Sequence, residues 1–110
     1  MKKPYLLLSV LFLISISISQ NMVNVSNLVK HGDKYFKENE YIPYNGIVFD
    51  ISKETGNRTL QFEMIDGFKN GSYKEWYSNG KPKTTGQYFN DDSTNSWAKW
   101  YENGQKKFEI

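Results

Sequence analysis

Short runs of apolar residues, separated by clusters of turn residues, occupy most of the chain after residue 40. The runs at residues 47–51, 59–65, 73–77 and 83–89 are rich in β-branched and aromatic side chains, which are enriched in strands. No window shows the spacing of three or four residues between apolar positions that marks an amphipathic helix. The pattern predicts a mostly or wholly β protein, built as an antiparallel meander of hairpins.

One stretch of sequence, residues 71–81, returns in altered form at residues 95–105, which gives an internal period of 24 residues. Both copies carry a Trp-Tyr pair two positions before an Asn-Gly pair, at Trp76, Tyr77, Asn79, Gly80, Trp100, Tyr101, Asn103 and Gly104. Gly56 lies 24 positions before Gly80 and belongs to a degraded first copy that has lost its Trp. A period of this length predicts stacked hairpin units, at about 46–70, 71–94 and 95–110.

The turn residues predict how these units are connected. Asn79-Gly80 and Asn103-Gly104 each lie between two strand-like runs, which favours hairpin turns of type I′ with positive φ at both central residues. In the link between the second and third units, Asn95 replaces Gly71, and Asp91 and Asp92 stand where glycine is expected. Since Asn and Asp tolerate left-handed backbone, we expect this link to keep its shape at some cost, or to be slightly longer and looser.

The first 19 residues have the order of a secretory signal peptide. A basic start is followed by an apolar run at residues 6–18, and Ser17 and Ser19 supply the small residues of a cleavage site near Ser19. A retained membrane anchor is the alternative, but the run is shorter than the roughly 20 residues of a spanning helix. We therefore expect an exported chain, located in the periplasm, on the cell surface or in the medium. Residues 20–44 are expected to form a lead-in and capping segment, flexible up to residue 27, with Pro43 at an edge or between strands.

Charge and cysteine content limit the possible partners. Removal of residues 1–19 takes Lys2 and Lys3 away and leaves 12 basic residues against 12 acidic ones. A formally neutral chain gives no argument for binding nucleic acid. The sequence contains no cysteine, so we expect aromatic side chains rather than disulfides to hold the core together.

The candidates for chemistry are few. His31, the single histidine, has no partner in the sequence pattern and is expected at the surface. Residues 90–92, Asn-Asp-Asp, lack the spaced glutamate of a calcium loop and are expected to form a solvated turn. No nucleophile motif is present, and nothing pairs two carboxylates for glycoside hydrolysis. We therefore expect no catalytic residue, no metal and no cofactor, and predict that the protein is not an enzyme.

Two stretches resemble a known repeat. The sequence Gly71-x-Tyr73-Lys74-Glu75-Trp76-Tyr77-x-Asn79-Gly80-Lys81 is similar to the repeat of the MORN-repeat-variant proteins, as is the stretch at 97–106. The resemblance covers roughly residues 35–110. It implies a sheet of stacked hairpins without a characteristic active site. Some members are catalogued as antitoxins of toxin–antitoxin systems, and MORN repeats are associated with protein scaffolding and with membrane lipids.

Aromatic residues are the main candidates for binding a partner. Because side chains alternate along a strand, Tyr73, Tyr77, Trp97 and Tyr101 are expected on one face and Trp76 and Trp100 on the other. One set packs on neighbouring hairpins; the other is either partly covered by lysine stems or lines an exposed aromatic strip, with Trp76 and Trp100 as the first choice. The candidate partner-binding residues are Tyr73, Trp76, Tyr77, Trp97, Trp100 and Tyr101.

The last predicted strand, residues 106–110, is the second candidate surface. Its charges either guard an open edge against uncontrolled pairing or leave room for a partner's strand, including self-association. The sequence thus favours a non-catalytic exported module that binds another protein, and the family label adds an antitoxin-like role. The alternative function is a module that associates with envelope lipid or glycan.

Overall fold

The computed structural model describes residues 21–110, so the signal-peptide prediction lies outside the described residues. In chain order the elements are β1 (Met22–Asn24), η1 (Val25–Asn27), β2 (Leu28–His31), β3 (Lys34–Lys37), β4 (Gly46–Ile51), β5 (Arg58–Ile65), β6 (Phe68–Trp76), β7 (Pro82–Phe89), β8 (Asp92–Ser93), β9 (Ala98–Trp100) and β10 (Lys106–Glu109). η1 is a single 3₁₀ turn, and residues 21–110 contain no α-helix. None of the described elements is therefore a helix with the length and hydrophobicity needed to cross a bilayer.

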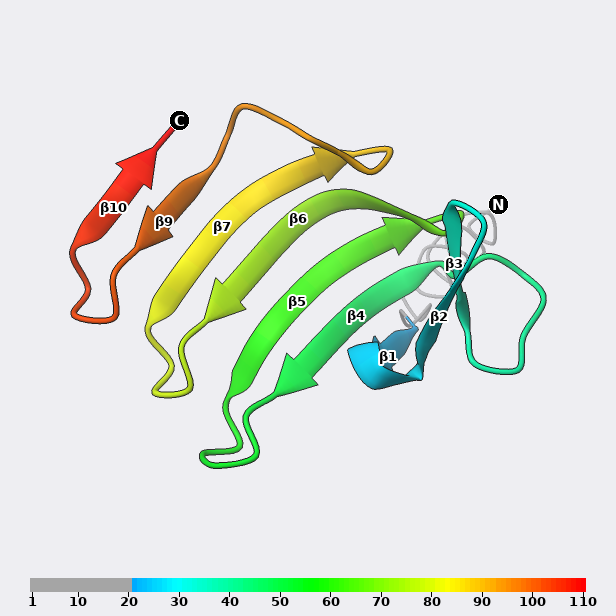
Figure 1. Ribbon diagram of the computed structural model, residues 1–110, viewed down its shortest axis with the longest axis horizontal. Helices are drawn as coiled ribbons and strands as arrows, with labels where there is room; N and C mark the ends of the chain where they lie inside the picture. Colours follow the sequence, from blue (N-terminus) through cyan, green and yellow to red (C-terminus); the bar gives the residue numbers. More distant parts are fainter. Residues whose placement is uncertain (1–20) are drawn as a thin grey trace, which may run out of the picture.

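Most strands belong to one large curved sheet in the order β1-β4-β5-β6-β7-β9-β10, and β8 pairs with the end of β7 (Figure 1). The neighbours from β4 to β10 are antiparallel, which confirms the prediction of a mostly β, antiparallel protein. β2 and β3 form a separate two-stranded sheet. In Figure 1 this small hairpin lies at the β4 end of the large sheet, far from β10.

The prediction of a flexible lead-in up to residue 27 is wrong. Residues 22–24 form β1, which runs parallel to β4 and pairs Val23 with Val48. Val23 is only 4% exposed, and the Ile47 amide donates a hydrogen bond to the Asn21 carbonyl at 2.9 Å. A strand of three residues with one buried valine leaves almost no periodic pattern in the sequence, and its partner lies more than 20 positions away.

One face of the large sheet carries the core, and we call it the core face. Its buried residues are Val23, Tyr44, Val48, Phe62 and Met64, and Val25, Leu28, Tyr35, Leu60 and Tyr73 pack against them. Leu28 and Tyr35 come from the β2–β3 hairpin, which therefore covers the β4–β5 half of this face. The hairpin is anchored by backbone hydrogen bonds, from Tyr35 to Gly67 and from Tyr44 to Tyr35, both 3.0 Å long. The opposite face, which carries Trp76 and Trp100, is called the outer face.

The prediction of type I′ turns at Asn79-Gly80 and Asn103-Gly104 is wrong. Positive φ occurs only at the glycines, at 93° for Gly80 and 94° for Gly104. In the first of these turns the Gly80 amide donates to Tyr77 and the Tyr77 amide donates to Lys81; the same two bonds recur 24 positions later. This is the geometry of a type I turn followed by a glycine bulge. Each Asn side chain accepts a hydrogen bond from the amide two residues on, at 2.9 Å and 3.0 Å, which stabilises the turn without positive φ at Asn.

Two consecutive residues with positive φ occur instead in the links between hairpins, at the opposite ends of the strands. Asp66 and Gly67 have φ of 53° and 80° between β5 and β6, and Asn90 and Asp91 have φ of 48° and 72° between β7 and β8. Positive φ at both central residues is the requirement of a type I′ turn. Asp91 lies 24 positions after Gly67, so an aspartate adopts nearly the same backbone angle as the glycine it replaces.

The indole ring of Trp97 packs on Gly86 of β7. Gly86 is buried opposite Tyr73, and a Cβ built on it would lie 2.2 Å from the indole ring of Trp97. Trp97 comes from the link between β8 and β9, so the chain folds its own indole over the bare backbone of β7. The ring replaces the side chain that Gly86 lacks, a known way to stabilise a glycine in a strand.

We predict that Gly86→Ala destabilises the fold by about 1–3 kcal/mol, because the added methyl group must displace the indole ring. Urea denaturation followed by circular dichroism measures the change. In a Trp97→Ala background the same substitution should cost only a few tenths of a kcal/mol or should stabilise, since alanine then fills empty space. Equal costs in the two backgrounds would contradict the packing of Trp97 on Gly86.

Candidate partner-binding surface

The structure separates the six predicted aromatic residues into two groups. Tyr73 and Trp97 lie on the core face with their ring centroids 5.6 Å apart. The alternation along β6 and β9 places Trp76 and Trp100 on the outer face. Tyr77 and Tyr101 each follow one of these tryptophans and continue the alternation on the core face. The first-choice strip of Trp76 and Trp100 is therefore on the opposite side of the sheet from the other four rings.

Four rings meet on the core face between β5 and β9. Tyr73 stacks on Phe62 at 5.8 Å, and Tyr88 meets Tyr73 edge-on at 5.5 Å and Trp97 at 5.3 Å. The Lys69 ammonium group lies over three of these rings, at 5.4 Å from Phe62, 6.0 Å from Tyr73 and 5.0 Å from Tyr88. The sequence analysis missed Phe62, Tyr88 and Lys69. Tyr88 alternates with Gly86 on β7, so a register prediction from the β6–β7 turn would have found it.

Two lysines cover the rings that follow the tryptophans. Lys83 lies over Tyr77 and Lys107 over Tyr101, each with its ammonium group 5.7 Å from the ring centroid. Each lysine is the extra residue of a bulge in a returning strand, because Trp76 pairs with Pro82 while Glu75 pairs with Thr84, and β10 skips residue 107 in the same way. A bulge re-aims the side chain it carries. The Tyr77 hydroxyl also donates a 2.7 Å hydrogen bond to the Trp100 carbonyl, which ties the second hairpin to the third.

The outer face is partly covered by cations. Lys106 lies over Trp100 at 5.8 Å, and Arg58 lies over Phe49 at 5.1 Å. Both Trp76 and Trp100 are only half-buried. Lysine and arginine stems here shield apolar rings from water while their charges stay exposed.

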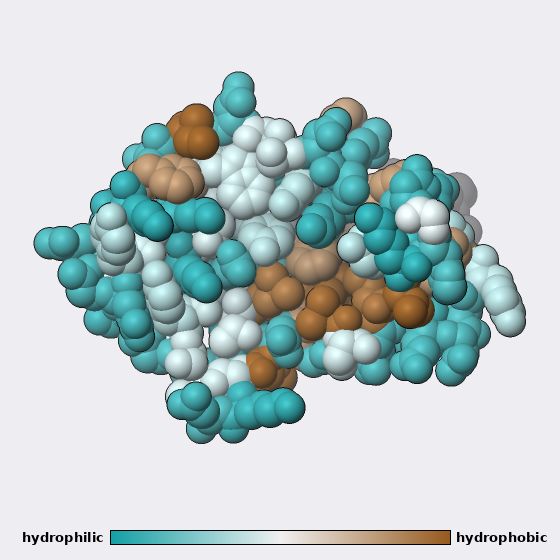
Figure 2. Space-filling model, in the orientation of Figure 1, coloured by the Kyte–Doolittle hydropathy of each residue, from teal (hydrophilic) through white to brown (hydrophobic). Residues whose placement is uncertain are grey.

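The core face is open on its C-terminal half, where the β2–β3 hairpin does not reach. In Figure 2 the main group of brown side chains lies from the middle of this face toward the β2–β3 hairpin, and white side chains extend from the middle toward β9 and β10, with polar side chains in teal around them. We call this half the aromatic–lysine surface, and it consists of Tyr73, Tyr77, Tyr88, Trp97, Tyr101, Phe108, Lys69, Lys83, Lys99 and Lys107. Among its rings Tyr101 is 50% exposed and Phe108 39% exposed. It is the half-exposed continuation of the core.

Burial and nearby carboxylates raise the pKa values of two tyrosines of this surface, Tyr73 and Tyr88. Burial, together with the Glu75 carboxylate and the Tyr88 hydroxyl, raises the pKa of Tyr73 to about 12. Burial also raises the pKa of Tyr88, with smaller contributions from Asp91 and Glu75. Both phenols are therefore protonated at physiological pH. They can act as hydrogen-bond donors but not as bases.

The remaining candidates for chemistry are His31 and the turn at residues 90–92. His31 is exposed and packs edge-on against Phe36 at 5.6 Å, and the turn at 90–92 is exposed, so both match the predicted surface positions. The Asp91 carboxylate accepts a hydrogen bond from the Lys69 amide at 3.2 Å. Within residues 21–110 no three His, Asp or Glu side chains come together in a way that could hold a metal ion.

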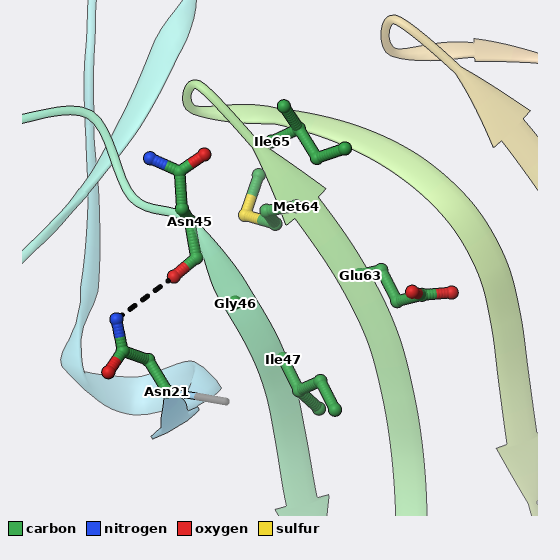
Figure 3. Close-up of a pocket in the computed structure, with 7 residues that line it drawn as sticks. All are labelled: Asn21, Asn45, Gly46, Ile47, Glu63, Met64 and Ile65. Carbon is green, nitrogen blue, oxygen red and sulfur yellow. Dashed lines mark hydrogen bonds between the residues drawn. The ribbon is translucent and has the colours of Figure 1, made fainter. Parts of the chain in front are cut away.

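A hollow of about 340 Å³ on the other side of the sheet is lined by Asn21, Asn45, Gly46, Ile47, Glu63, Met64 and Ile65 (Figure 3). Its amide groups are engaged with the backbone, since the Asn21 side chain donates to the Asn45 carbonyl at 3.3 Å. Its single carboxylate, Glu63, accepts hydrogen bonds from the amide and the hydroxyl of Ser72 at 2.8 and 2.9 Å. The Glu63 side chain thereby stabilises the bulge of β6 and is not paired with a second acid or base.

β10 is the last strand of the large sheet, and all four of its residues are exposed. Lys106 and Glu109 form a 2.9 Å ion pair along the strand. Charged pairs of this kind discourage indiscriminate strand pairing.

We predict that stability falls as the pH rises from about 10 to about 12, because the unfolded chain loses the Tyr73 proton in this range before the folded chain does. Tyr73→Phe should show a shallower fall in the urea midpoint over the same range. Tyr41→Phe, at a ring that is 95% exposed, is the matched control. An unchanged slope in Tyr73→Phe would show that this phenol is not held in its neutral form.

Comparisons of the chain with models of known protein families, with curated proteins and with solved structures gave no match. The resemblance to MORN-repeat-variant proteins therefore rests on the residues of the chain alone.

Proposed function

We propose that this chain is a non-catalytic module that binds another protein through the aromatic–lysine surface. The observation that carries the proposal is the uncovered half of the core face, where six rings continue the core without a second layer above them in the described part of the chain. Tyrosine and tryptophan are enriched at protein interfaces and among the residues that dominate binding energy. A partner seated here would bury rings that the β2–β3 hairpin leaves half-exposed.

The titratable groups of this surface favour binding over catalysis. Its shifted groups are tyrosines, whose pKa values move upward and away from neutral pH. General acid–base catalysis needs groups with pKa values close to the working pH. Hydroxyl groups that stay protonated are suited to donating hydrogen bonds to a partner.

We infer that the hairpins are repeat units of the MORN-variant type. The support is the recurrence, 24 positions apart, of the turn hydrogen bonds at Gly80 and Gly104 and of the ring–lysine pairs at Tyr77 and Tyr101. The first hairpin differs, because Gly56 donates to Ser52 and its turn is one residue wider. An antitoxin role follows only from the family label and requires a toxin in the same compartment.

We predict that the double variant Tyr101→Ala/Phe108→Ala loses its protein partner. Both rings are exposed, so their removal should leave the fold intact, and loss of two interface anchors should weaken binding by about 2 kcal/mol or more, roughly thirtyfold. Crosslinking of the tagged chain in its native host, followed by affinity capture and mass spectrometry, identifies the partner. Titration of the purified partner then gives the dissociation constants.

The matched control is Ile65→Ala/Phe89→Ala, which removes two rim side chains, 54% and 66% exposed, from the outer face. It should bind as well as the original chain. Equal loss in both double variants, or no loss in the first, would reject this surface as the binding site. The variant Trp76→Ala/Trp100→Ala tests the outer-face strip in the same assay.

Association with envelope lipid or glycan is the second candidate function, favoured by exposed rings such as Tyr41, which is 95% exposed. Co-sedimentation of the mature chain with liposomes and with polysaccharide tests it. Retention on neither material would reject this alternative.

Export is proposed from the leader-like residues 1–19. We predict that the protein isolated from the native host begins at Gln20, because a signal peptidase would cut after Ser19. Intact-mass measurement of the purified protein gives the answer directly. A mass that includes residues 1–19 would show that the leader is retained.

A further inference from the structure

Within residues 21–110, the four ammonium groups of the aromatic–lysine surface form no ion pair. The described part of the chain has two ion pairs, Lys34 with Asp66 and Lys106 with Glu109, and none involves Lys69, Lys83, Lys99 or Lys107. These four lysines lie on adjacent strands from β6 to β10. Lys83, Lys99 and Lys107 lie near the hairpin tips on three neighbouring strands, which are about 4.8 Å apart. Lys69 lies at the other end of β6, roughly 20 Å away along the strand direction.

Each of the four lysines is held in place by an aromatic ring. Lys69 lies over three rings, Lys83 and Lys107 over one tyrosine each, and Lys99 lies over Phe108 at 5.9 Å. A cation over a ring face is attracted by the ring quadrupole, so part of its conformational freedom is already lost. Charges that are ordered before binding cost less entropy when a ligand arrives. The cluster is therefore a preorganised set of cations.

The two bulges make this arrangement specific. In a regular strand, side chains alternate strictly between the two faces. The bulges at Lys83 and Lys107 interrupt this alternation and let both lysines lie on the core face. The bulges lie 24 positions apart. Each places its lysine over the tyrosine of its own hairpin, and the distance is 5.7 Å in both. Two hairpins thus present equivalent cations on the core face.

We infer that the segment of the partner that contacts this surface is an acidic stretch of protein; the inference rests on the proposed function and names the chemistry of its partner. Unpaired cations on an open face favour an anionic ligand by charge complementarity. The rings beneath the lysines give apolar or aromatic side chains of the same segment a place to pack.

Two other ligands fit the surface less well. A neutral glycan has no charge that could pair with the four ammonium groups. An anionic membrane presents negative charge over its whole surface. It would repel the carboxylates of Glu75 and Asp91, which lie close enough to Tyr88 to raise its pKa. A peptide can place a neutral residue opposite those carboxylates.

The test uses a fluorescein-labelled peptide of alternating glutamate and tyrosine as the probe, titrated by fluorescence anisotropy at about 0.15 M ionic strength. A peptide with glutamine in place of glutamate is the first comparison. We expect the acidic peptide to bind about tenfold more tightly, and this difference to shrink as salt is added. Equal binding of both peptides would overturn the inference, because it would show contact with the rings alone.

The variant Lys83→Glu/Lys99→Glu/Lys107→Glu should weaken binding of the acidic peptide about tenfold or more. The matched control is Lys37→Glu/Lys53→Glu/Lys74→Glu, which makes the same change in net charge at three exposed lysines elsewhere and should change the affinity less than about twofold. Circular dichroism checks that both variants are folded. An equal loss in the two variants would overturn the inference in favour of unspecific attraction.

Vesicles of phosphatidylcholine with phosphatidylglycerol, and polygalacturonate, are tested with the same variants. Binding to either material that exceeds binding to the acidic peptide would overturn the inference. The outcomes also separate this inference from the proposed function. If Tyr101→Ala/Phe108→Ala loses the captured partner and the lysine reversals have no effect, the proposed binding surface stands and the acidic partner segment is rejected. If neither variant has an effect, both the binding surface and the acidic partner segment are rejected.

Discussion

Burial of half of one sheet face under the β2–β3 hairpin is the interaction on which this structure depends. Val23, Val48, Phe62 and Met64 are almost fully buried there, and the hairpin supplies Leu28 and Tyr35 as the second layer. A small domain without disulfides has few other sources of stability, because its surface is large relative to its volume. The backbone bonds from Tyr35 to Gly67 and from Tyr44 to Tyr35 fix the hairpin over the strands it covers.

Beyond the reach of the β2–β3 hairpin, the core face is covered only by side chains of the sheet strands and of their connecting segments. Trp97 lies over Gly86 and touches Tyr73 and Tyr88, so a tryptophan from a connecting segment acts as the cover that a second layer would otherwise provide. Lysine stems continue this cover toward β10. Such a cover is thin, and it leaves rings and charges accessible together. The proposed binding to a partner depends on this exposure.

The turns explain how similar hairpins keep the same spacing. Left-handed pairs at one end and glycine bulges at the other recur 24 positions apart, and the backbone angles agree within about 10° between Gly67 and Asp91 and between Gly80 and Gly104. Hydrogen bonds then join neighbouring hairpins at their tips, as from the Tyr77 hydroxyl to Trp100 and from the Thr55 hydroxyl to Ser78. The turn chemistry therefore sets which rings and lysines of successive hairpins line up.

The sequence by itself determined the hairpin strands β4, β5, β6, β7, β9 and β10, though not the short β8. It also determined the positions of the hairpin tips and the assignment of Tyr73 and Trp97 to one face and Trp76 and Trp100 to the other. These features follow from local composition and from the alternation of side chains, which neighbouring residues decide. Tertiary structure decided the parallel pairing of β1, the place of the β2–β3 hairpin, the turn types, and the contact of Lys69 with three rings. Each of these depends on residues that are distant along the chain or on one extra residue in a strand. Only the tertiary structure decided which half of the core face stays open, because this depends on how far the ten-residue β2–β3 hairpin reaches across the sheet.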